Sequence, residues 1–277
     1  MSLLATRDLT VRFGGHVAVN AVTCAFEPGT LTAIVGPNGA GKTTYFNLIS
    51  GQLKASAGQV TLDGHDLSGF SPSERTRAGL GRAFQLTNLF PRLTVLENIR
   101  LAVQATRPGQ HRHGLNLWSI WSDHRELTAR ADEILVAVAL GEKEHELVAN
   151  LPHGDQRKLE VALLMALEPQ VFMFDEPTAG MNAVEAPVIL NLIRKLKEDR
   201  TKTILLVEHK MDVVRELADR IIVLHNGALV ADGDPADVIA SPVVQEAYLG
   251  LSPQDAKAQD ATPLFSLPPR GPRSEVP

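Results

Sequence analysis

The chain has 277 residues, 44% of them hydrophobic, which is enough to bury one large domain or a domain with a subdomain. Its formal net charge of -5 at pH 7 excludes the general basic character of a nucleic-acid-binding protein. A single cysteine, Cys24, excludes an intrachain disulfide and indicates a reducing compartment.

Cys24 lies in the apolar run 19–26, which favours a buried structural thiol over a reactive one. No apolar stretch approaches the ~18–20 residues needed to cross a bilayer. The first residues have no charged n-region and too short an apolar run for a signal peptide. We therefore expect the chain by itself to be soluble and cytoplasmic.

The first part of the chain predicts mostly β structure. Strands at 9–13 and 17–26 flank Gly14-Gly15, a pair typical of a hairpin turn. A buried apolar strand follows at 31–35, and a helix is predicted from 44. Another short strand, at 59–62, ends in Asp63-Gly64.

From 93 to 140 the pattern becomes helical, with an interruption at 106–123 that holds both tryptophans, Trp118 and Trp121. A second series then predicts helices at 155–167, 183–197 and 211–217, strands at 171–174, 203–207 and 220–224, and a hairpin turn at Asn226-Gly227 into 228–231. Strands alternating with helices predict a parallel sheet covered on both faces. The Pro-rich tail from 252 predicts disorder.

Between the strand at 31–35 and its helix lies Gly36-Pro-Asn-Gly-Ala-Gly-Lys-Thr43, which fits G-x-x-x-x-G-K-[ST]. This arrangement points backbone N–H groups and the positive helix end at one place, as a polyphosphate requires. Gly39 and Gly41 would let the backbone approach the phosphates without a Cβ in the way. Lys42 would reach the β- and γ-phosphates, and Thr43 would offer its hydroxyl to Mg²⁺. A chance glycine turn would not explain this context.

A second motif, Val171-Phe-Met-Phe-Asp175-Glu176, is an apolar strand that ends in two carboxylates. At the carboxyl end of a buried strand, Asp175 would lie beside the phosphate loop and hold Mg²⁺ directly or through water. Glu176 would then polarise an attacking water, as a general base or an orienting group. The alternative interpretation is that Asp175 and Glu176 only cap a following helix, and the presence of the phosphate loop makes this interpretation the weaker one.

Two single residues, His209 and Gln85, are informative only in combination with these two motifs. His209 follows the apolar strand 203–207 and could hydrogen-bond the γ-phosphate and sense its loss, although a lone histidine is more often structural. Gln85 could contact the metal or the water, and is unremarkable by itself. Both roles need the support of a family.

In this order the segments resemble the nucleotide-binding subunit of ATP-binding cassette (ABC) transporters across residues 3–250. The family's phosphate loop, glutamine loop, signature, Asp–Glu strand and switch histidine match 36–43, Gln85, 151–156, 175–176 and His209. The resemblance implies an α/β fold: a P-loop NTPase core with a parallel sheet, an N-terminal antiparallel β subdomain and an inserted α-helical subdomain. It assigns 1–250 to the nucleotide-binding domain, about 86–165 to the helical subdomain with an insertion at 104–125, and 251–277 to the tail.

The resemblance also implies ATP hydrolysis with ATP and Mg²⁺, and a role for each site residue. The implied nucleotide contacts are Phe13, Asn38, Gly39, Gly41, Lys42, Thr43 and Thr44, and Gly154 would face the nucleotide of an opposite subunit. The implied catalytic residues are Glu176, His209 and Gln85. The implied metal contacts are Thr43, Gln85 and Asp175. Phe13 stands where the family stacks an aromatic on adenine, and a strand-core aromatic is the competing interpretation.

Finer features resemble the ATPases of branched-chain and other hydrophobic amino acid importers. They are Val207-Glu-His209, Thr178-Ala-Gly-Met-Asn182, the run 154–160, the insertion around Trp118 and Ala247-Tyr-Leu-Gly250. Lipopolysaccharide-export ATPases share several of them and stay open as an alternative. The branch implies integral membrane permease subunits, a second ABC ATPase subunit and, indirectly, a periplasmic or extracellular substrate-binding protein as partners, with the chain peripheral on the cytoplasmic face of the membrane.

The signature departs from the family pattern, Leu-Ser-Gly-Gly-Gln or Leu-Ser-Tyr-Gly, and here is Leu151-Pro-His-Gly-Asp155. In the family this segment faces the ATP of the other subunit in a head-to-tail dimer. Pro152 brings neither a hydroxyl nor a backbone donor, which leaves the Gly154 N–H and the helix start near Asp155. A homodimer would then have two weakened sites, and because two different ATPase subunits are usual in the resembled importer branch, we favour a heterodimer with one complete site. Alternatively, Pro152 is tolerated because the helix dipole and the glycine provide most of the interaction with the opposite subunit's ATP.

Other classes explain less. A GTPase would need an Asn-Lys-x-Asp motif, which is absent, and a small-molecule kinase would leave the signature-like segment and His209 unexplained. Non-transport ABC factors in translation or DNA repair usually carry two cassettes or an inserted coiled coil. By resemblance, the segment after Gln85 would receive a cytoplasmic permease helix, with Leu89, Phe90 and Leu93 either exposed there or capping the local core.

Overall fold

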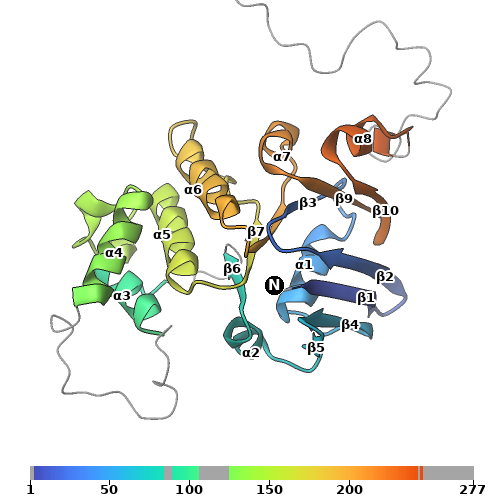
Figure 1. Cartoon of the computed structure of the whole chain (residues 1–277), viewed down its shortest axis with the longest axis horizontal. Helices are drawn as coiled ribbons and strands as arrows, with labels where there is room; N and C mark the ends of the chain where they lie inside the picture. The colour runs from blue at the N-terminus through green and yellow to red at the C-terminus, as the bar shows by residue number, and fades with distance from the viewer. Residues whose placement is uncertain (1–2, 84–88, 106–124, 243, 246–277) are drawn as a thin grey trace, which may run out of the picture.

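Figure 1 shows a computed structural model of the chain, which describes residues 3–83, 89–105, 125–242 and 244–245. The described residues form two β-sheets and a group of helices. None of these helices is both long and apolar enough to span a membrane. Gln85, Trp118, Trp121 and the tail from 251 lie outside the described residues, so what was predicted for them stays a prediction.

The smaller sheet is antiparallel, with strand order β2-β1-β4-β5. Its strands are β1 (Leu4–Phe13), β2 (His16–Phe26), β4 (Ala57–Leu62) and β5 (His65–Asp66). β1 begins at Leu4 rather than at the predicted Leu9. Asp8 has a φ of 48 and the register with β2 shifts beside it, which interrupts the alternation that would have indicated one long strand.

The larger sheet has strand order β10-β9-β3-β8-β7-β6 and is parallel except for β10. Its strands are β3 (Leu31–Val35), β6 (Leu80–Ala83), β7 (Val171–Asp175), β8 (Thr203–Val207), β9 (Arg220–His225) and β10 (Ala228–Gly233). The predicted parallel sheet is therefore confirmed. Strand β6 was not predicted, because its four residues, Leu-Gly-Arg-Ala, have no clear apolar period.

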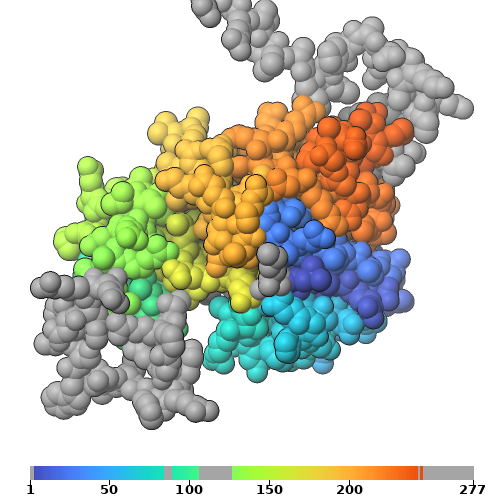
Figure 2. All heavy atoms as spheres, in the orientation of Figure 1, coloured from blue at the N-terminus to red at the C-terminus, as the bar shows by residue number. Residues whose placement is uncertain are grey.

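Helices cover the larger sheet on both faces. The helices of the described residues are α1 (Lys42–Ser50), α2 (Pro72–Arg77), α3 (Val95–Ala105), α4 (Arg125–Ala137), α5 (His153–Ala166), α6 (Ala186–Glu198), α7 (Met211–Leu217) and α8 (Pro235–Ala240), with short 3-10 turns at Gly141–Lys143 and Val148–Asn150. Of these, α3 and α4 pack against α5 and each other rather than on the sheet. Figures 1 and 2 place α3 and α4 (green) at one end of the molecule and the smaller sheet (blue) toward the other.

Alternate residues of the central strands supply two separate cores. Phe172 and Phe174 of β7 pack with residues of α5, α6 and α7, whereas Met173 between them packs with α1 and the smaller sheet. This period of two is what a strand buried on both faces requires. Helix α1 is thereby held between the two sheets, and it brings the phosphate loop with it.

Two helix starts differ from the prediction or were missed. α6 begins at Ala186 rather than near 183, because the Asn182 side chain accepts hydrogen bonds from the N–H groups of Val184 and Glu185 and holds them in a turn. The short helix α2 was not predicted, although Ser71 and Glu74 form a capping box around Pro72 at its first turn.

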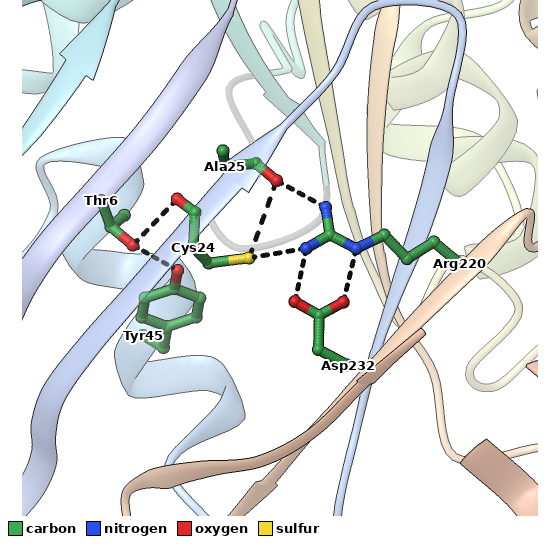
Figure 3. A network of polar contacts seen from close by, with 6 residues as sticks. All are labelled: Thr6, Cys24, Ala25, Tyr45, Arg220 and Asp232. Carbon is green, nitrogen blue, oxygen red and sulfur yellow. Dashed lines mark hydrogen bonds and ion pairs between the residues drawn. The ribbon is translucent and has the colours of Figure 1, made fainter. Parts of the chain in front are cut away.

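A polar network ties the two sheets together (Figure 3). Arg220 of β9 forms a two-point ion pair with Asp232 of β10 and donates to Cys24 Sγ at 3.6 Å, while Tyr45 OH of α1 lies 2.8 Å from Thr6 Oγ1. Burial raises the pKa of the Cys24 thiol to about 11, against the influence of Arg220. The predicted buried structural thiol is confirmed, and its sulfur is part of this network.

Candidate nucleotide site

The phosphate loop connects β3 to α1 through glycines with positive φ. A Cβ on Gly36 would lie 2.2 Å from the Leu224 carbonyl oxygen, and one on Gly41 would lie 2.5 Å from that of Ala18. The protein's own backbone therefore requires a glycine at position 41, and the predicted close approach of Gly41 to the phosphates stays a prediction. Gly39 has a φ of 80 and nothing within 4 Å of such a Cβ, so its face is open to a ligand.

The back of the loop is held by the turn between β9 and β10, which is itself hydrogen-bonded to β2. The carbonyl oxygen of Ala40 accepts the Gly227 N–H at 3.0 Å, and the Gly227 oxygen accepts the Asn20 N–H at 2.8 Å. At the front, Gly41 occupies the cap position of α1 and offers no side chain to the first N–H groups of the helix. Asn38 and Thr43 are exposed beside them. The loop is rigid behind and presents donors in front.

Lys42 curls back over this loop. Its Nζ donates to the Gly36 oxygen at 2.7 Å and to the Pro37 oxygen at 3.0 Å, and the residue is only 8% exposed. Burial lowers the pKa of the Lys42 ammonium, and the nearby Glu176 and Asp175 carboxylates counteract part of that effect. An anion at the loop would replace the neutral carbonyls as partner of a partly desolvated charge, which strengthens the attraction.

The Asp–Glu motif ends β7 in the same region. Asp175 is buried, whereas Glu176 has a φ of 47 and a side chain that is 42% exposed. The Glu176 N–H donates to the Val207 oxygen of β8 at 2.9 Å. Two residues beyond Val207, His209 Nδ1 lies 3.6 Å from Glu176 Oε1. The structure thus brings Glu176 and His209 together, since β7 and β8 are neighbours.

One residue of this site was missed by the sequence analysis. Arg82 of β6 forms an ion pair with Asp175 Oδ2 at 2.8 Å, and its side chain is 8% exposed. A buried arginine requires a carboxylate or several acceptors, so a charge inside an apolar-flanked strand just before Gln85 was the available signal. Burial raises the pKa of Asp175, and Arg82 counteracts that rise.

The donor set fits a magnesium ion that arrives with a nucleotide. Thr43 offers a hydroxyl and Asp175 a carboxylate, both hard oxygen ligands. Across the described ranges, no group of three or more His, Cys, Asp or Glu residues could hold a metal by itself. Mg²⁺ typically uses one or two protein oxygens and takes the rest from phosphates and water. The residues present match that pattern.

Comparisons with known proteins bear on this site. A family model described as "ABC transporter" matches residues 19–179, and one described as "Branched-chain amino acid ATP-binding cassette transporter" matches residues 228–250. The chain is 38% identical to the high-affinity branched-chain amino acid transport ATP-binding protein LivG of Escherichia coli K12, over 90% of this chain and 98% of that protein. The chain belongs to the ABC transporter ATP-binding family.

BraF of Pseudomonas aeruginosa, named as another high-affinity branched-chain amino acid transport ATP-binding protein, is also 38% identical over 90% of this chain and 98% of its own length. The ADP conformation of an ATP-binding cassette from an ABC transporter superimposes with a TM-score of 0.75 at 29% identity, and covers 91% of this chain and 100% of that one. The predicted ABC ATPase fold and the predicted ATPase activity are confirmed.

Phe13 lies at the end of β1 of this ABC ATPase and is 51% exposed. The competing interpretation, a core aromatic, was therefore wrong. An exposed ring at a strand end is free to stack on a base, so adenine contact stays a prediction. In the segment predicted to contact the permease, Leu89 packs against the core, whereas Phe90 is 54% exposed.

The signature segment starts α5. Pro152 is the exposed cap residue, and its carbonyl accepts the Gln156 N–H at 3.0 Å. The Asp155 carboxylate is paired with Lys143 at 2.6 Å and Lys158 at 2.8 Å, which compensates its negative charge beside the start of the helix. Burial raises the pKa of Asp155, but the hydrogen bonds from Lys143 and Lys158 outweigh it, and the pKa is lowered overall.

Glu185 is a second residue that sequence reasoning missed. A Cβ added to Gly154 would lie 2.3 Å from Glu185 Oε1, so this carboxylate rests directly on the signature glycine. The position of Glu185 is set by the turn before α6, where Asn182 bonds its N–H. No local sequence pattern relates Glu185 to Gly154, because the contact depends on how α5 and α6 pack.

Proposed function

We propose that this ABC ATPase powers the import of branched-chain or other hydrophobic amino acids. The observation that carries the proposal is the match of residues 228–250 to the branched-chain cassette model. The names of the LivG and BraF relatives support the same cargo. These names favour the amino acid branch over lipopolysaccharide export, whose ATPases share the Tyr-Leu-Gly sequence at the carboxyl end.

The site residues divide the reaction among them. Lys42 and the N–H groups at the start of α1 bind the β- and γ-phosphates, and Thr43, Asp175 and Gln85 are the proposed contacts of a Mg²⁺ that would neutralise phosphate charge when bound. Glu176 takes or orients the proton of the attacking water. His209, held 3.6 Å from Glu176, contacts the γ-phosphate side of the same water.

ATP binding and hydrolysis drive transport through the partners. Two ATPase subunits close around ATP, because each phosphate group is contacted by the loop of one subunit and the signature of the other. Permease subunits follow this closure at the cytoplasmic face of the membrane, and a substrate-binding protein delivers the cargo to them. Phe90, exposed next to the glutamine-loop region, is available for the permease contact.

A pull-down of the full chain from detergent-solubilised native membranes tests this assignment, with bound proteins identified by mass spectrometry. We expect permease subunits of the amino acid importer type together with a second ATPase. Recovery of lipopolysaccharide-export permeases would contradict the amino acid cargo and assign lipopolysaccharide export instead. Ribosomal or DNA-repair proteins would contradict the transport role and favour a remodelling factor.

We further propose a heterodimer with unequal sites. Pro152 caps α5 without a hydroxyl, and Glu185 covers Gly154, so this signature offers the partner's ATP fewer donors and a nearby negative charge. The complete site would combine Lys42, Asp175, Glu176 and His209 with the signature of the other subunit. Loss of one preorganised donor to a transition-state oxyanion costs about 10²–10³-fold in rate.

Pro152→Ser in the assembled complex separates the dimer types by the size of its effect. In a heterodimer the other site already turns over, so repair of the slow site is expected to raise the ATPase rate only about twofold; in a homodimer the gain would be about 100-fold. Steady-state phosphate release measures this. Pro72→Ser, at the exposed start of α2, is the matched control. An unchanged rate would contradict the role assigned to Pro152.

A further inference from the structure

Arg82 is the centre of a buried polar cluster at the magnesium end of the site. Its guanidinium donates to Asp175 Oδ2 at 2.8 Å and to both Asn47 Oδ1 and Ser50 Oγ at 2.7 Å. It also lies 5.0 Å from the centroid of the Phe46 ring. The last three partners belong to α1, the helix that starts at the phosphate loop, so Arg82 connects this helix to the end of β7.

The backbone fixes this arrangement. β6 and β7 pair in parallel, with Arg82 opposite Met173, which places the arginine side chain within reach of the end of β7. Asp175 itself is only 8% exposed, so without a positive partner its carboxylate would be a desolvated charge. Arg82 provides that partner.

We propose that Arg82 is the resident counter-ion of Asp175 in the nucleotide-free cassette, and that it sets how much Mg²⁺ the bound nucleotide needs. Arg82 and Mg²⁺ share one carboxylate. The interaction of either cation with the Asp175 carboxylate weakens the interaction of the other, so binding of Mg²⁺ and the Arg82 ion pair are negatively coupled. This inference rests on the magnesium role of Asp175 in the proposed function.

Arg82 also orients Asp175, and loss of orientation would act in the opposite direction. We expect the repulsion between the Arg82 charge and Mg²⁺ to outweigh this loss of orientation. A full positive charge in direct contact with the carboxylate opposes a doubly charged ion in a buried setting, where screening is weak. Aspartate has a short side chain with few rotamers at the end of a paired strand, so little order is lost with the arginine.

Arg82→Gln is the test, followed by thermal melting with EDTA and no nucleotide, and by Mg²⁺ titration in the presence of a non-hydrolysable ATP analogue. Without ligand, the variant is expected to melt about 10 °C below the wild type, because a buried carboxylate has lost its partner. With the analogue, the Mg²⁺ concentration that gives half of the stabilisation is expected to fall about tenfold.

Arg75→Gln is the matched control. Arg75 is also largely buried and donates to the Leu48 and Ile49 carbonyl oxygens at the end of the same helix, and no hydrogen bond or ion pair joins it to Asp175. It should lower the melting temperature without moving the Mg²⁺ midpoint. Arg82→Lys keeps the charge and should also leave the midpoint near the wild-type value, which provides a readout if Arg82→Gln does not fold.

Two results would overturn the inference. A Mg²⁺ midpoint that is unchanged in Arg82→Gln, or that shifts equally in Arg75→Gln, would make Arg82 a structural residue only. A tenfold shift in Arg82→Lys would show that geometry rather than charge sets the magnesium requirement. If the wild type itself shows no response to Mg²⁺, the magnesium role of Asp175 fails first, and that outcome is distinguishable from the other two.

Discussion

Glu176→Gln is expected to reduce steady-state ATP hydrolysis by about 10²–10⁴-fold while ATP still binds. The amide has nearly the shape of the carboxylate but cannot accept a proton from the attacking water. The backbone that places the side chain is unaffected, because the residue at 176 keeps its N–H bond to the Val207 oxygen. The loss should therefore lie in turnover and not in folding.

In the proposed mechanism hydrolysis reopens the ATPase dimer, so Glu176→Gln should accumulate an ATP-bound closed dimer. Phosphate release measures the rate, and size-exclusion chromatography with ATP measures the dimer. Glu198→Gln, an exposed carboxylate at the end of α6, controls for the change in net charge and should behave as the wild type. Steady ATPase activity in Glu176→Gln would mean that another group activates the water.

Lys42→Ala is expected to weaken ATP binding by about 3 kcal/mol, roughly 100-fold in Kd, and to abolish turnover. The ammonium is partly buried over the phosphate loop and held by two loop carbonyls, so it is preorganised for phosphate oxygens. Removing it leaves the bound phosphates without their only direct cation from this loop. Fluorescence titration with a labelled ATP analogue measures the affinity.

The control for this substitution is Lys54→Ala. Lys54 is exposed beyond the end of α1 and carries the same charge. It should change neither the affinity nor the rate. If Lys42→Ala binds ATP as tightly as Lys54→Ala does, the phosphates do not sit where the loop geometry indicates, and the nucleotide site must be assigned again.

Most of the strands and helices that carry the site could be predicted from the sequence, because each follows from a local pattern. Val171–Asp175 and Thr203–Val207 are short apolar runs that end in polar residues, and β7 and β8 have these bounds within one residue of the prediction. Elements without such a pattern were missed or misplaced. β6 is short and contains Gly81 and Arg82, and β1 is interrupted at Asp8.

The sequence by itself located the phosphate loop and the paired carboxylates, because each is a contiguous motif whose chemistry depends on neighbours along the chain, whereas His209 became a candidate only through the family resemblance. Only the tertiary structure decided which distant side chains complete them. Arg82 reaches Asp175 across 93 positions because β6 pairs with β7, and Glu185 rests on Gly154 because of the turn before α6. Such contacts follow from strand order and helix packing, and the local spacing of apolar residues along the chain predicts neither of them.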